Sequence, residues 1–231
     1  MQPQYDISGY NASATLGATQ NKVLRNTYMM LGLTMIPTVI GALVGMTMDF
    51  SFMAGSPILS AVIMLAVAFG LFFAISATRD SAMGVVLLLA LTGFMGLMLG
   101  PILQVALSLS NGGEIITLAA GGTGAIFFTL AGIATVTKKD FSFMGKFLMV
   151  GIVLLILASL ANLFFQIPAL ALTLSAAAVL LFSGFILYDV SRVVTGGETN
   201  YVMATLAIYL DIYNLFVNLL QLLMALMGER E

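Results

Sequence analysis

Long apolar runs alternate with short polar connections along nearly the whole chain. Seven runs are predicted as helices: residues 26–48, 57–77, 83–107, 115–136, a fifth from near Lys146 to Phe165, 168–194 and 201–227. Each has roughly the 20 residues that an α-helix needs to cross the hydrocarbon of a bilayer. The short alternating strands of a membrane β-barrel do not fit runs of this kind. The pattern predicts an all-α integral membrane protein, a seven-helix bundle in a lipid bilayer.

The first 20 residues differ from the apolar runs. They are polar, contain Gly, Pro, Ser and Asn, and lack the basic and apolar regions of a signal peptide. We therefore expect a disordered tail over residues 1–20 and a single transmembrane domain over residues 21–231.

Glycines gather in two of the predicted helices. Gly93, Gly96 and Gly100 follow three- and four-residue spacing, which lets another backbone approach closely within the membrane. The AAGGTGA stretch, with Gly121, Gly122 and Gly124, offers small residues for the same kind of packing. It is not a phosphate-binding loop, because no Lys-Ser or Lys-Thr follows the glycines.

Composition sets the class of protein independently of any motif. Of 231 residues, 61% are hydrophobic and 8% are charged, which leaves too little polar surface for a soluble domain of this size. Cys and His are absent, so disulfides, thiol chemistry, imidazole-ligated haem, His-based zinc sites and His general bases are excluded. The net charge of -2 argues against a nucleic-acid partner.

Basic residues occur in alternate connections between the predicted helices. They flank the first helix and follow the second, fourth and sixth, at Lys22, Arg25, Arg79, Lys138, Lys139, Lys146 and Arg192. Because cytoplasmic loops carry an excess of Lys and Arg, we expect a cytoplasmic N-terminus. Seven full crossings would place the C-terminus on the other side of the membrane.

Two aspartates lie inside the last two apolar runs. Asp189 stands about one turn from the predicted cytoplasmic end of its helix, and Asp211 stands ten residues into the next helix from the same end. A carboxylate inside a membrane is costly, so a functional site is the default hypothesis for both.

The TGGETN loop joins the two helices, and the spacing allows the two carboxyls to touch without requiring it. Two carboxyls in contact would share one proton and so tie the helices together. Without that proton they would repel each other unless a cation such as Ca²⁺ entered, since Ca²⁺ prefers oxygen ligands. The alternative for Asp189 is an ion pair with Arg192, one turn away at the helix end.

Asp211 also belongs to a polar stripe along the last helix. Asn214, Asn218 and Gln221 follow it at spacings of three, four and three, which places all four on one face. Such a face cannot point at lipid, because its polar groups would lack hydrogen-bond partners there. We expect the last helix to lie at the centre of the bundle; the alternative is an amphipathic helix that lies in the membrane interface.

Several stretches together resemble one family of membrane proteins: LTGFMGLMLGPIL, KKDFSFMGKFLMVGIV and ILYDVSRVVTGGETNYVMATLAIYLDIYNLFVNLLQLL. The chain is similar to the Bax inhibitor/YccA-like family over residues 22–225. Its NKVLRNTY opening and GGETNYV loop are most similar to the bacterial YccA branch. The resemblance implies the Bax inhibitor-like fold, with seven helices and the last one central, in a bacterial inner membrane. There, the seven full crossings expected from the basic residues would put the C-terminus in the periplasm, unless the last segment is re-entrant.

The resemblance also implies functional residues and a partner. Asp189 and Asp211 match the family's di-aspartyl pH sensor, which in some members gates a Ca²⁺ leak. Leak-forming members carry an acidic residue inside their second helix and an arginine latch near its end; here the helix interior is uncharged and Arg79 is the only candidate latch. We expect Arg192, Asn214 and Asn218 to support the pair. YccA-like members are associated with the membrane-anchored AAA protease FtsH, as slow substrates that restrain it.

Two functional hypotheses follow. The first is a pH-sensitive cation leak or transport protein, with Asp189 and Asp211 as sensor and Ca²⁺ site and no other cofactor. The second is a regulatory protein that modulates FtsH, with the polar N-terminal tail as a handle for the protease. A membrane enzyme is the least favoured interpretation, because an intramembrane aspartyl protease would place its second aspartate in a Gly-x-Gly-Asp setting, whereas Asp211 lies in YLDIY.

Overall fold

The computed structural model describes residues 8–51 and 55–228, and this part of the chain forms helices without strands. The helices are α1 (Ser8–Thr47), α3 (Pro57–Thr78), α4 (Ala82–Met98), α5 (Gly100–Leu107), α6 (Gly112–Thr137), α7 (Met144–Phe165), α8 (Pro168–Thr195) and α9 (Tyr201–Met227). In this part of the chain, seven helical segments are long and apolar enough to cross a membrane, with α4 and α5 counted as one. The predicted seven-helix membrane bundle is confirmed.

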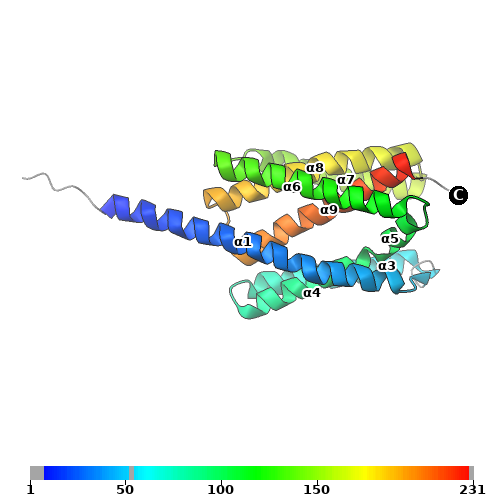
Figure 1. The fold of residues 1–231 in the computed structure, drawn as a ribbon, viewed down its shortest axis with the longest axis horizontal. Coiled ribbons are helices and arrows are strands. Elements are labelled where there is room, and N and C mark those ends of the chain that lie inside the picture. The colour runs from blue at the N-terminus through cyan, green and yellow to red at the C-terminus, as the bar shows by residue number, and fades with distance from the viewer. Residues whose placement is uncertain (1–7, 52–54, 229–231) are drawn as a thin grey trace, which may run out of the picture.

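The first helix is longer than the sequence pattern predicts. It begins at Ser8, so residues 8–20 of the expected disordered tail are helical, and residues 1–7 lie outside the described residues. Extending an existing helix costs much less than nucleating a new one, and the alanines at 12, 14 and 18 favour the extension. As a result, the N-terminal part of α1 projects beyond the other helices (Figure 1).

The third predicted helix is broken near its end. α4 ends at Met98 and α5 begins at Gly100, so Leu99 lies between two separate helical pieces. Pro101 explains the break, because proline has no N–H to donate to the preceding turn.

The last helix lies at the centre of the bundle, as predicted. α9 packs against α1, α3, α4, α6 and α8. Figure 1 shows it crossing the molecule between α6 and α8 on one side and α1 and α4 on the other. Its fully buried side chains take part in all three apolar clusters of the bundle, and they include Val202, Leu206, Tyr209, Leu215 and Leu220. By contrast, α7 packs chiefly against α8, and most of its apolar surface is exposed, as expected of a helix that faces lipid.

Close backbone contacts join α1 to the α4–α5 span. A Cβ added at Gly96 would collide with the Thr38 carbonyl oxygen, and one added at Gly100 would collide with the backbone of Gly45. The predicted role of these two glycines is confirmed. The prediction for AAGGTGA is wrong at Gly121 and Gly124, where a Cβ would meet nothing within 4 Å.

Candidate functional site

The carboxyl groups of Asp189 and Asp211 lie within hydrogen-bonding reach of each other, between the cytoplasm-facing end that we predict for α8 and the third turn of α9. The Asp189 side chain is 13% exposed and Asp211 is 6% exposed. Both aspartates therefore come together in the protein interior, which the spacing in the sequence allowed but did not require.

One oxygen of the pair lacks a partner. Asp211 Oδ2 is buried and accepts no hydrogen bond from any described residue. The group that faces Asp211 is the Asp189 carboxyl, which can donate only when the pair carries a proton. An unmatched buried acceptor is costly, so this arrangement favours a proton held between the two carboxyls.

Arg192 also binds the pair, on the side of Asp189. Its Nη1 lies 3.6 Å from Asp189 Oδ1, and its Nη2 lies 3.8 Å from Glu198 Oε2. The guanidinium carbon lies 5.6 Å from the centre of the Tyr188 ring. The two alternatives for Asp189, a contact with Asp211 or an ion pair with Arg192, are therefore both present in the structure.

For the other predicted supporting residues, the hydrogen bonds and ion pairs found within the described part of the chain go to groups other than the two aspartates. Arg79 directly follows the last residue of α3 and lies in an exposed turn, where its Nε is 3.8 Å from Oδ2 of its neighbour Asp80. The structure thus does not place Arg79 as a latch on the pair. The Asn214 and Asn218 amides donate to α9's own backbone, at Leu210 O and Asn214 O, both at 2.8 Å.

α9 is also held by a polar contact of Tyr209 that the sequence analysis did not predict. The Tyr209 hydroxyl lies 2.9 Å from Thr38 Oγ1 of α1 and 3.3 Å from the Thr92 carbonyl oxygen of α4. Tyr209 precedes Asp211 by two residues, so the two side chains leave α9 in different directions. The signal in the sequence was weak, because an isolated tyrosine in an apolar helix is as compatible with packing as with hydrogen bonding.

Ser191 fixes the α6–α7 connection beside the pair. Its hydroxyl accepts from the Phe141 N–H at 3.0 Å and donates to the Lys139 carbonyl at 3.1 Å. Ser191 itself is fully buried. The segment of α8 that carries Asp189 is therefore bonded directly to the neighbouring loop.

The acidic side chains of the described residues are not grouped as the several ligands of a metal site. Among the described residues, no group of three or more His, Cys, Asp or Glu side chains could hold a metal ion. Asp189 and Asp211 offer oxygen atoms, the ligand type that Ca²⁺ prefers, but Ca²⁺ takes six to eight of them. Water or backbone oxygens would have to supply most ligands of an ion at this pair.

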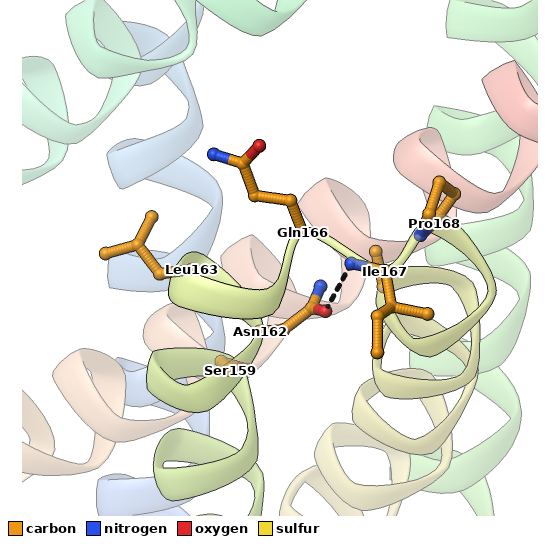
Figure 2. A pocket seen from close by; sticks show the side chains of 7 residues that line it. Ser159, Asn162, Leu163, Gln166, Ile167 and Pro168 are labelled. Carbon is orange, nitrogen blue, oxygen red and sulfur yellow. Dashed lines mark hydrogen bonds between the residues drawn. The ribbon is translucent and has the colours of Figure 1, made fainter.

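A separate hollow lies at the far end of α8. Its volume is about 390 Å³, and Figure 2 shows the lining side chains around the α7–α8 turn, where Asn162 Oδ1 accepts from the Ile167 N–H at 3.0 Å. A neighbouring hollow of about 200 Å³ shares Asn162 and includes Asn218 and Gln221 of the polar stripe. The polar stripe of α9 therefore extends from Asp211 to the hollow near the α7–α8 turn.

Comparison with known proteins places these features in a family. The family model described as inhibitor of apoptosis-promoting Bax1 matches residues 20–228. A protein of Escherichia coli named modulator of FtsH protease YccA is 42% identical over 203 residues, which cover 88% of this chain and 90% of the relative. A protein of a second Escherichia coli strain, named inner membrane protein YccA, matches with the same identity and coverage. An uncharacterized protein of Neisseria meningitidis is 40% identical over 228 residues, 98% of this chain and 99% of the relative.

Proposed function

The chain belongs to the family described as inhibitor of apoptosis-promoting Bax1, and from this premise we propose that it is an inner-membrane protein whose Asp189–Asp211 pair gates a cation leak that passes Ca²⁺. The observation that carries this proposal is the Asp211 carboxyl, which lies against the Asp189 carboxyl and whose buried Oδ2 has no donor among the described residues.

The proposed gate works through the charge of the pair. With one shared proton, the two carboxyls form a hydrogen bond that holds α8 against α9. Without it, two negative charges face each other in a medium of low dielectric, and the Arg192 guanidinium, 3.6 Å from Asp189 Oδ1, offsets part of that charge. A cation that approaches then relieves the repulsion. The small number of protein oxygens suits an ion in transit better than one that is bound permanently.

The test is Ca²⁺ flux into liposomes that contain the purified protein, measured across a pH series. The proposal predicts a leak whose rate depends on pH. Replacing Asp49, an exposed carboxylate that bonds to Ser51 outside the membrane spans, by Asn should leave the profile unchanged. Absence of flux at every pH would contradict the proposal.

A second function is favoured by a different observation. The Escherichia coli relative that shares 42% identity is named a modulator of FtsH protease, so we propose that this chain also modulates a membrane-anchored AAA protease of the FtsH type. The N-terminal part of α1, which projects beyond the bundle, is the segment that such a protease would engage (Figure 1).

This second proposal is tested by deletions at the N-terminus. Removing residues 2–20 should weaken pull-down of FtsH and slow the turnover of the chain in cells that contain the protease. Removing residues 2–7 alone is the matched control, because it leaves the helical part of α1 in place. Equal pull-down and equal turnover of the 2–20 deletion and the full chain would exclude this role for the segment.

A further inference from the structure

The side chain of Asn200 bonds in two directions at the start of α9. Its Oδ1 accepts from the N–H groups of Val202 and Met203, both at 3.0 Å, and so caps the helix. Its Nδ2 donates to Asp80 Oδ1 at 2.7 Å and to the Arg79 carbonyl at 3.2 Å. One side chain therefore fastens the first turn of α9 to the α3–α4 turn.

Asn200 is also connected to the aspartate pair through a series of polar contacts. The backbone N–H of Asn200 donates to Glu198 Oε1 at 2.9 Å, and Glu198 Oε2 lies 3.8 Å from Arg192. Arg192 in turn contacts Asp189. A continuous series of polar contacts thus runs from Asp80, whose side chain is 83% exposed, to the buried pair.

The position of α9 determines the position of Asp211. Asp211 lies ten residues after Tyr201, about 15 Å along a helix that rises about 1.5 Å per residue. A packed helix moves as a unit, so a shift of its capped first turn is carried to Asp211. The helix that carries Asp189 has an additional anchor of its own, because Ser191 bonds it to the α6–α7 connection.

We propose that Asn200 is a positioning residue for the Asp189–Asp211 pair: by fastening the first turn of α9 to the α3–α4 turn, it determines where Asp211 lies relative to Asp189. The functional role of Asn200 rests on the proposed gate, whereas its hydrogen bonds to α9 and to the α3–α4 turn are properties of the fold.

Asparagine suits this position because it offers both an acceptor and a donor. Aspartate at position 200 would keep the cap but would turn a carboxylate towards Asp80. Asparagine at position 80 would keep an acceptor for the Asn200 amide. The double variant, Asp80→Asn with Asn200→Asp, exchanges the donor and the acceptor and restores a hydrogen bond between the two side chains.

The experiment uses the absence of cysteine from the chain. Cysteines placed at the exposed residues Ala77 and Thr195 carry spin labels that report the distance between the end of α3 and the end of α8 in lipid bilayers. The four proteins are the labelled parent, Asn200→Asp, Asp80→Asn and the double variant, each measured across a pH series and checked for folding by gel filtration.

In the parent, the distance should shift with pH, and replacing both Asp189 and Asp211 by Asn should remove the shift. Asn200→Asp should remove the pH-dependent shift in the distance between the labels or broaden the distance distribution. Asp80→Asn should keep the shift, and the double variant should recover it. The inference is overturned if Asn200→Asp behaves as the parent does, if the double variant folds without recovery, or if the parent distance does not respond to pH. Ca²⁺ flux of the parent is measured in parallel, so failure of the proposed leak is seen separately from failure of the link.

Discussion

The carboxyl of Asp189 faces that of Asp211 across the contact between α8 and α9, while Arg192 lies 3.6 Å from the same Asp189 side chain. The pair therefore has a cation beside Asp189, while its own buried oxygen, Asp211 Oδ2, lacks a donor among the described residues, inside a bundle whose other core side chains are mostly apolar. Buried charges are rarely kept for stability, because apolar replacements of similar size are often neutral or stabilising. The proposed gate, which depends on protonation of the pair, would account for its presence.

The first prediction concerns stability at the pair. Asp211→Asn should keep or raise the free energy of unfolding at neutral pH, by up to about 1–3 kcal/mol, because the amide supplies a donor to the Asp189 carboxylate and removes the unmatched Oδ2. Asp211→Ala offers no such donor and serves as the comparison. Thermal unfolding in detergent measures both. If Asp211→Asn lowered the free energy of unfolding as much as Asp211→Ala does, a donor at position 211 would not stabilise the pair.

The second prediction concerns the contact of α1 with α4. Gly96→Ala should destabilise the bundle by about 1–3 kcal/mol, because its methyl group would collide with the Thr38 carbonyl. Gly132→Ala in α6 is the control, since a Cβ there meets nothing within 4 Å and alanine favours the helix. Equal stability of the two variants, measured by thermal unfolding in detergent, would mean that the helices do not approach as closely as the structure shows.

The third prediction concerns the connection between α6 and α7. Ser191→Ala removes both hydrogen bonds that fix this connection, so trypsin should cleave more rapidly at the lysines 138, 139 and 146. The control is Ser142→Ala, which removes a bond to Asp140 within the loop but leaves the contact with α8. Equal cleavage rates in Ser191→Ala and the parent chain would contradict a fixing role for Ser191.

Much of this architecture is predictable from the sequence because the membrane imposes simple rules. Apolar length identifies the seven spans, and the polar face of the last helix requires a central position. Details that depend on the third dimension were not predictable. The position of Arg79 depends on where α3 ends, and the double role of Asn200 depends on which turn lies beside it. Neither can be derived from spacing along one helix.

The glycine patterns illustrate the same limit. Gly96 and Gly124 both lie in sequences rich in small residues, yet only Gly96 faces another backbone. Spacing shows that one face of a helix carries small residues, but whether another helix packs closely against that face depends on the three-dimensional arrangement. The start of α1 at Ser8 was missed for a related reason, since local polarity does not reveal that an adjacent helix will extend through it.

The most direct test of the gate is Ca²⁺ flux across a pH series for three proteins in the same liposomes: the natural chain, Asp189→Asn and Asp211→Asn. Asparagine cannot ionise, so each substitution should flatten the pH dependence of a leak that is pH-dependent in the natural chain. The Asp49→Asn control should retain the natural profile. Unchanged pH profiles in both variants at the pair, or no flux from the natural chain at any pH, would contradict a gate formed by Asp189 and Asp211.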